Sequence, residues 1–482
     1  MTSFRSKTVR SLAWSFGSKT LSQVISIVFG IILARLLVPE DFGLITMVMV
    51  LMGFAGLLSD VGLGSALIQK KDVIADHFSA VFWFNSLIGL LLTICLIFLA
   101  PQIAIFYSRP ELELIAVVLS FTFILSAISM VPRTRLAKEL AFKKLAIVDF
   151  FSLFFSGCIA ITMAFKGYGY WSLVAHQLIE RLLSTTFVWL LSDWKPQLRH
   201  NIKVISELIG FGSTVFATRT LRHAALQADK LIIGKFLGAV SLGLYDKAYS
   251  MMLFPLQNIS IVIGNVMFPS LSTIQDDVAH VRDIYLRMTG AISLLTFPMM
   301  AGMFVISESF VLGVLGEQWA EIIPLFKIFC VVGFFISIAT VTGPVYLSQG
   351  KAKLQLKINL INQPLIIFGI IVGLKWGLIG IVIGFSITTI IGVLITWWIV
   401  GKLIKLKFRK IIFNLLPAFI LSIVMAYIVS QLSSLLGETS HIVMFLYQFG
   451  MGVLSYVILV LIVKPKPYLE VIKVLKKEYV NN

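Results

Sequence analysis

Residues 377–400 read GLIGIVIGFSITTIIGVLITWWIV, an apolar run without one charged side chain. A helix rises 1.5 Å per residue, so about 20 such residues cross the hydrocarbon core of a bilayer. Lys375 precedes the run and Lys402 follows it, as expected where a helix leaves the membrane on either side. Similar runs recur along the whole chain. We therefore expect this segment to be one transmembrane helix among many.

The composition supports that interpretation. Of the 482 residues, 58% are hydrophobic and 13% are charged, against about 25% charged in a typical soluble domain. The mean hydropathy is +0.96. A soluble protein could not cover this much apolar surface with so few polar side chains. The composition excludes soluble multidomain, fibrous and disordered proteins, and predicts an all-α polytopic membrane protein.

The apolar runs predict about fourteen transmembrane helices. The expected spans are 11–36, 43–68, 79–100, 112–131, 147–166, 170–192, 205–234, 243–269, 286–312, 322–346, 358–374, 377–400, 411–431 and 442–463.

Basic residues alternate between the two sets of connecting loops. The loops that share a side with the N-terminus hold 28 of the 40 Lys and Arg residues. The opposite loops hold only Arg35, Arg109, Lys166, Lys235 and Lys375. By the positive-inside rule both termini are cytoplasmic. The net charge of +17 then faces the anionic inner leaflet, and it indicates no nucleic-acid partner, which would need one basic face on a soluble domain.

A weak internal repeat divides the chain. Residues 35–44 resemble residues 235–244 at an offset of 200, and residues 16–18 resemble 211–213 at an offset of 195. Both pairs fall around the first and seventh spans. Six spans are an even number, so the second copy starts on the same side of the membrane, and the two halves are predicted to be parallel repeats related by an axis along the membrane normal. The expected domains are an N-terminal lobe 1–204, a C-terminal lobe 205–410, two extra spans in 411–463, and a basic amphipathic tail 464–482.

Charged residues inside the expected spans are the candidate functional residues, because a charge in the bilayer is costly unless it faces a cavity or a partner. Span seven carries Arg219, Arg222, Asp229 and Lys230, spaced to share one helical face. One carboxylate cannot neutralise three cations, so an excess of positive charge remains. Such an excess predicts an anionic passenger, and arginine binds phosphate through two parallel hydrogen bonds.

Other expected spans add polar side chains to this set. Span one carries Lys19, Gln23 and Ser26, span two carries Asp60, and span six carries Gln177, Glu180 and Arg181. We expect the stripes of spans one and seven to face each other. The cationic cavity would use Arg219, Arg222, Lys19, Lys230 and Arg181, lined by Gln23, Ser26 and Gln177. Asp60, Glu180 and Asp229 are candidates for coupling to a proton or sodium gradient. Structural pairing between helices, and snorkelling of Lys19 to the interface, are the alternatives.

Motifs of enzymes and metal sites are missing. Cys95, Cys158 and Cys330 lie far apart in apolar runs, and the histidines show no metal-ligand spacing. The sequence contains no P-loop and no GxSxG element, and the short outer loops hold no clustered carboxylates. We expect no cofactor, no metal and no enzymatic activity.

Four motifs resemble those of a known family. They are ARLLVPEDFG at 34–43, SDVGLGSALI at 59–68, the basic stretch 132–143 with Arg133, Arg135, Lys138 and Lys143, and FPSLS at 268–272. They resemble the polysaccharide exporter family of the multidrug, oligosaccharidyl-lipid and polysaccharide exporter superfamily, and are most similar to its colanic-acid exporter branch. The similarity covers residues 1–275 well, and the remainder matches in span spacing.

The resemblance implies a flippase of the bacterial inner membrane. It would move undecaprenyl-diphosphate-linked oligosaccharide from the inner to the outer leaflet by alternating access of two six-helix lobes around a cationic cavity. Membrane lipids, and the polymerase and chain-length components of the same pathway, are the other implied partners. Three alternatives stay open. A drug/cation antiporter would favour an acidic cavity, a membrane polymerase or glycosyl transferase would need carboxylates in long outer loops, and a scaffold would leave the charges within the spans unexplained.

Overall fold

The computed structural model describes residues 2–59, 63–69, 75–197, 203–437 and 439–470, although some side chains, among them those of 2–16 and 203–226, lie outside the description. This part of the chain is helical and contains no strand. Ten of its segments are long and apolar enough to cross a membrane, and some of these, such as Ala352–Leu403, contain two successive helices. The predicted all-α polytopic fold is confirmed.

Contacts divide the chain into two compact units, 1–243 and 244–482, and each is described by itself. The predicted lobe boundary near residue 204 rests on the repeat, not on contacts, and stays a prediction. Unit 1 holds α1 (Thr2–Leu36), α2 (Pro39–Ser59), α3 (Leu63–Gln69), α4 (Ala75–Tyr107), α5 (Glu111–Lys138), α6 (Phe142–Phe165) and α7 (Trp171–Leu191). The long α8 (Lys203–Thr273) runs from unit 1 into unit 2. Unit 2 continues with α9 (Val278–Phe310), α10 (Ile322–Ala339), α11 (Thr342–Ser348), α12 (Ala352–Gly373), α13 (Gly377–Leu403), α14 (Phe408–Ser434) and α15 (His441–Val463).

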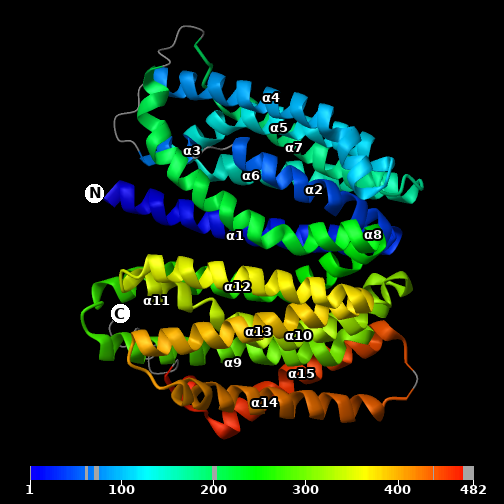
Figure 1. Cartoon of the computed structure of the whole chain (residues 1–482), viewed down its shortest axis with the longest axis vertical. Coiled ribbons are helices and arrows are strands. Elements are labelled where there is room, and N and C mark those ends of the chain that lie inside the picture. Colours follow the sequence, from blue (N-terminus) through cyan, green and yellow to red (C-terminus); the bar gives the residue numbers. More distant parts are fainter. Residues whose placement is uncertain (1, 60–62, 70–74, 198–202, 438, 471–482) are drawn as a thin grey trace. The chain divides into compact units, whose positions relative to one another are not determined.

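The helices of the two units pack in the same order (Figure 1). In unit 1, α4 packs on α5, α5 on α7, and α7 on α6. In unit 2, α9 packs on α10, α10 on α13, and α13 on α12. These are the third, fourth, sixth and fifth spans of each expected half. The shared order is what two copies of one six-span unit would produce, while α14 and α15, the two extra spans, pack on α9.

Small residues allow the closest helix contacts. A Cβ built on Gly373 of α12 would lie 2.3 Å from the carbonyl oxygen of Gly380 on α13, and one on Gly384 would lie 2.1 Å from that of Gly369. In unit 1, a Cβ on Gly89 of α4 would lie 3.1 Å from the carbonyl oxygen of Phe123 on α5. Backbones that approach this closely are typical of membrane helices, where packing takes the place of the hydrophobic effect.

One expected span is interrupted in the structure, because the span predicted at 322–346 is divided into α10 and α11. Pro344 supplies the reason, because proline has no N–H to donate to the carbonyl of Thr340, where α10 ends. The described parts of the span predicted at 43–68 lie in α2 and α3. Of the predicted tail, residues 464–470 are described, and Pro467 packs against Gly290 of α9. The rest of the tail lies outside the described residues.

The seventh and eighth expected spans form the continuous run α8, which turns at Gly238 (φ 80°, ψ −175°). At this turn the two copies of the repeat cross. A Cβ on Gly43 would lie 1.8 Å from the carbonyl oxygen of Ala239, and a Cβ on Gly243 would lie 2.0 Å from that of Pro39. The contact is reciprocal at the offset of 200, since Gly43 corresponds to Gly243 and Pro39 to Ala239. Reciprocal contacts are the mark of a two-fold relation, so this crossing supports the predicted repeat.

Candidate functional site

The polar stripe of the first span lies on α1. Lys19 and Ser26 are exposed and Gln23 is half-buried, so none of the three belongs to the core of unit 1. α1 packs instead on α6, where the ring of Phe29 would meet a Cβ on Gly157 at 2.1 Å. The binding of a ligand by the stripe stays a prediction. Whether it faces the seventh span stays a prediction.

The seventh span forms the first part of α8. Arg219 and Arg222 lie on this helix, but their side chains are outside the described residues, as is Asp60. Asp229 is buried, with 8% of its surface exposed, and its Oδ1 accepts a hydrogen bond from the backbone N–H of Lys230 at 2.8 Å. Lys230 is half-buried. Asp229 lies nine residues before Gly238, about 13 Å along the helix, and within the last turns of the expected seventh span.

α7 carries the remaining predicted residues. Gln177 and Glu180 are half-buried and Arg181 is exposed. Sequence reasoning missed His176, whose Nδ1 lies 3.1 Å from Oγ of Ser156 on α6. The available signal was spacing, because His176 and Glu180 are one helical turn apart on the same face. α7 thus presents a histidine and a carboxylate together.

Contacts between connecting segments show which loops lie together at each end of unit 1. At one end Arg109 forms an ion pair with Glu40 at 2.9 Å, and Nζ of Lys235 donates to the carbonyl of Phe106. At the other end Lys138 donates to the carbonyl of Leu67 at 2.8 Å, and Lys144 donates to that of Leu191 at 2.8 Å. The loops that meet at each end belong to the same set in the charge count. The predicted alternation of the spans is therefore consistent with the packing.

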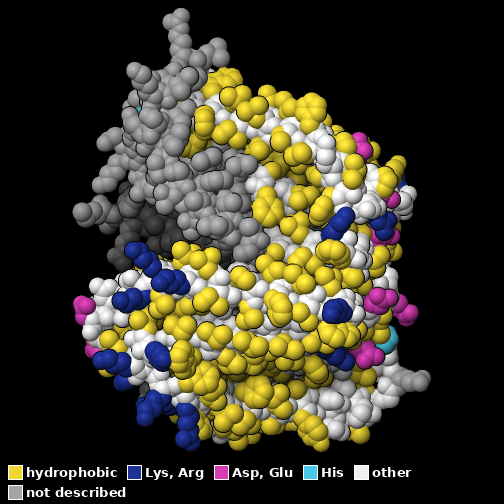
Figure 2. Space-filling model, in the orientation of Figure 1, with side chains coloured by type: hydrophobic (Ala, Val, Ile, Leu, Met, Phe, Trp, Pro, Cys, Tyr) yellow, Lys and Arg dark blue, Asp and Glu magenta, His cyan; other side chains and the backbone are white. Residues whose placement is uncertain are grey.

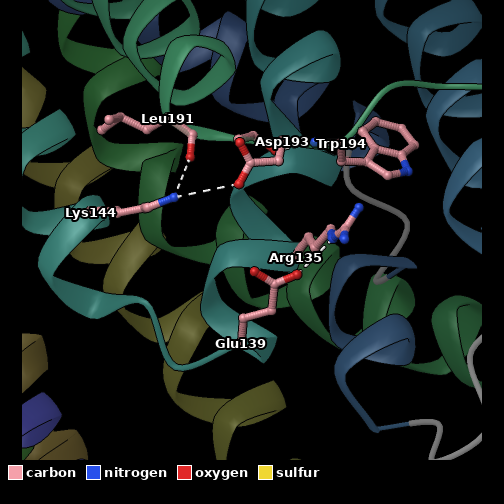
Figure 3. Close-up of polar contacts among 7 residues, drawn as sticks. Arg135, Glu139, Lys144, Leu191, Asp193 and Trp194 are labelled. Carbon is pink, nitrogen blue, oxygen red and sulfur yellow. Dashed lines mark hydrogen bonds and ion pairs between the residues drawn. The ribbon is translucent and has the colours of Figure 1, made fainter.

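The basic residues of the second end are held by polar contacts. Nε of Arg135 lies 2.7 Å from Oε1 of Glu139, and Nζ of Lys144 lies 3.9 Å from Oδ2 of Asp193 (Figure 3). Arg133 pairs with Asp149 and donates to Ser184 at 3.0 Å. This basic loop is an ordered part of unit 1.

Unit 2 shows the same separation of charge. Figure 2 shows an apolar band over its helices, with most of the visible basic side chains gathered at one end and acidic side chains visible at both ends. The exposed basic residues at the ends of α12, α13 and α14 include Lys351, Lys353, Lys402, Lys405 and Lys410. Glu317 and Glu321, between α9 and α10, are exposed. The band matches a lipid-facing surface. Within the described residues, no group of three or more His, Cys, Asp or Glu side chains could hold a metal ion.

Comparison with known proteins identifies the family. Residues 32–324, well over half of the chain, match the family described as polysaccharide biosynthesis protein. The chain belongs to this family. The resemblance inferred from the motifs is thereby confirmed.

Curated relatives of this polysaccharide biosynthesis protein cover most of its length. The lipopolysaccharide biosynthesis protein WzxC of Escherichia coli K12 is 25% identical over 429 residues, which are 87% of this chain and 86% of WzxC. The teichuronic acid biosynthesis protein TuaB of Bacillus subtilis is 26% identical over 384 residues, 78% of each chain. The succinoglycan biosynthesis transport protein ExoT of Rhizobium meliloti is 26% identical over 320 residues, 66% of this chain and 65% of ExoT.

Solved structures show the same fold. The lipid II flippase MurJ, in an inward closed conformation, superposes with a TM-score of 0.73 at 18% identity, over 93% of this chain and 98% of MurJ. An inward-facing multidrug transporter of the MATE family, in the MOP superfamily, gives a TM-score of 0.63 at 13% identity, over 80% and 94% of the two chains. The polysaccharide biosynthesis protein therefore has the two-lobed fold of that superfamily.

Proposed function

We propose that this protein is a flippase that moves lipid-linked oligosaccharide units from the inner to the outer leaflet of the bacterial plasma membrane. The observation that carries the proposal is the surplus of cations at membrane depth on a chain of this family and fold. In unit 1, Lys19 is exposed on α1 and Arg181 on α7, while Lys230 follows the buried Asp229 on α8. Three cations within the expected spans one, six and seven match an anionic passenger. The family's part in polysaccharide biosynthesis and the likeness to the lipid II flippase support the same conclusion.

The diphosphate of an undecaprenyl carrier is the group that we expect these cations to bind. Arg219 and Arg222 are the main ligands of this proposal, with Lys19, Lys230 and Arg181 beside them. Arginine presents a planar fork that matches two phosphate oxygens, whereas lysine is a point charge. Gln23, Ser26 and Gln177 would supply neutral hydrogen bonds. Alternating access of the two lobes, with both termini in the cytoplasm, would carry the headgroup across.

Asp229 and Glu180 are proposed to couple transport to a proton or sodium gradient, with Asp60 as a third candidate. A carboxylate within a membrane span can bind a proton or a sodium ion that crosses together with the substrate. Asp229 is buried and Glu180 is half-buried beside His176 on α7. Replacement of Asp229 by Asn would therefore uncouple export from the gradient.

The test is polymer export by cells that carry Arg219→Ala or Arg222→Ala. Each charge-assisted contact to phosphate contributes about 1.5–3 kcal/mol, so each change should weaken carrier binding roughly 10- to 150-fold. We expect normal amounts of folded protein and a severe loss of export, with a milder loss for Arg→Lys. Arg409→Ala, on an exposed part of α14, is the matched control and should export normally. Normal export by both arginine variants would refute the diphosphate role, and loss of the variants from the membrane would favour structural pairing.

A further inference from the structure

A pocket of about 370 Å³ lies at the basic end of unit 1, apart from the residues proposed to bind the carrier diphosphate. Its walls are Phe78 near the start of α4, Arg135, Lys138 and Glu139 at the end of α5, and Trp194 in the extended segment after α7. Its volume falls in the range of small-molecule sites, about 300–1,000 Å³. The three segments belong to the loops that the charge distribution predicts to be cytoplasmic.

The aromatic wall is held rigidly. Trp194 is buried. The centroid of its ring lies 5.6 Å from that of Phe82 and 6.0 Å from that of Trp189. The same segment is fixed at its far end, because the N–H of Gln197 donates to Oγ of Ser79 at 3.1 Å and Nε1 of Trp83 donates to the carbonyl of Gln197 at 3.0 Å. The pocket is therefore a built feature of unit 1.

The charged wall has a positive balance. It contains two cations, Arg135 and Lys138, and one carboxylate, Glu139. Arg135 contacts Glu139 through Nε, and a guanidinium carries five N–H donors, so donors remain for a ligand. The bond from Lys138 to the carbonyl of Leu67 anchors the ammonium group beside the pocket. Figure 3 shows Arg135 and Glu139 facing each other below Trp194, with Lys144 directed to the neighbouring Leu191 and Asp193.

We propose that this pocket binds the phosphate of a lipid headgroup in the inner leaflet. An arginine fork and a lysine ammonium are the usual ligands of phosphate. Tryptophan and phenylalanine suit the boundary between headgroups and acyl chains. The choice of the inner leaflet depends on the proposed function, in which both termini, and therefore this end of unit 1, are cytoplasmic. The phosphate can belong to an anionic phospholipid or to the isoprenoid diphosphate of the carrier, and the experiment below separates these two sources.

The experiment measures lipid binding to the full-length protein in detergent by native mass spectrometry. The probes are phosphatidylglycerol, farnesyl diphosphate and a neutral diacylglycerol. The test variant is Arg135→Gln/Lys138→Gln. The matched control is Lys353→Gln/Lys357→Gln, which removes the same charge from exposed positions of α12. We expect the test variant to bind the phosphate probes at least about 10-fold more weakly, and the control and the diacylglycerol to show no such change.

The outcomes are distinct. Stronger retention of phosphatidylglycerol identifies a phospholipid site, and stronger retention of farnesyl diphosphate identifies a site for the carrier. Equal binding by wild-type protein and the test variant, or an equal loss in the control, overturns the proposal. If the double variant does not fold, the binding assay is repeated with Arg135→Gln alone. This single change should be tolerated, because the side chain is partly exposed and its ion pair is with Glu139, one helical turn away. The assay involves no transport, so its failure would leave the flippase proposal to the export test of Arg219 and Arg222.

Discussion

Functionally interesting residues in this protein differ sharply in how deeply their side chains are buried. Lys19 and Ser26 stand exposed on α1, while Asp229 is enclosed on α8. Trp194, which lines the pocket described above, is also buried, and its indole packs against the rings of Phe82 and Trp189. Trp376, by contrast, has 68% of its surface exposed. These two tryptophans allow packing to be tested at the scale of one side chain.

We expect Trp194→Ala to destabilise unit 1 strongly. Truncation of a buried large aromatic residue costs about 3–5 kcal/mol, because contacts are lost and a cavity remains. Trp376→Ala removes an exposed ring and should change stability little. The measurement is the thermal unfolding midpoint of each variant in detergent. Equal midpoints for the two variants would contradict the packing role of Trp194.

At the scale of elements, backbone contacts decide how the helices meet. The start of α2 crosses the turn of α8, and Gly43 and Gly243 make the crossing possible. Neither position has room for a methyl group, because each would collide with a carbonyl oxygen of the other element. The contact is reciprocal, so the two glycines should be equally sensitive to substitution.

Gly43→Ala and Gly243→Ala are expected to lower stability by similar amounts, about 1–3 kcal/mol each or more, as in other overpacked sites. Gly30→Ala on α1 is the matched control, because a Cβ there would have no neighbour within 4 Å. It should be neutral or slightly stabilising, since alanine favours helix over glycine. Yields and unfolding midpoints of the purified variants give the answer. A harmless Gly243→Ala beside a disruptive Gly43→Ala would argue against the two-fold relation.

At the scale of the whole molecule, the distribution of charge determines orientation. The loops that meet at one end of each unit carry most of the basic residues, and the opposite loops carry few. The positive-inside rule predicts that the basic end of each unit is cytoplasmic. The predicted parallel repeats require this same orientation of both halves.

Cysteine labelling in spheroplasts tests this orientation. In a variant in which the three native cysteines are replaced, single cysteines at the exposed positions of Lys166 and Lys375 should react with a membrane-impermeant maleimide from outside. Cysteines at Lys143 and Lys405 should react only after lysis, because the positive-inside rule predicts that these positions are on the cytoplasmic side. Labelling of position 405 from outside, with position 143 still protected, would mean that the halves have opposite orientations.

The sequence alone was sufficient to predict the properties that depend on composition, on the length of apolar runs and on the spacing of repeated motifs. Each apolar run corresponds to helix in the described part of the chain, because a helix in lipid must satisfy its own backbone hydrogen bonds within one segment. The motif at 34–43 led to the family, and the offset of 200 between Gly43 and Gly243 predicted the repeat. The polar stripes that contain Lys19 and Asp229 could also be recognised from the sequence, because a charged residue within an apolar run stands out without knowledge of its neighbours in space.

Only the tertiary structure decided which segments lie against each other. The contact of His176 with Ser156, the crossing at Gly43 and Gly243, and the pocket beside Trp194 all join residues that are distant in the chain or on separate helices. An apolar run has the same appearance whether it faces lipid or another helix, because lipid tails and leucine side chains are equally apolar. The order of helix packing, and the sites that it builds, therefore come from the fit of particular side chains and backbones in three dimensions.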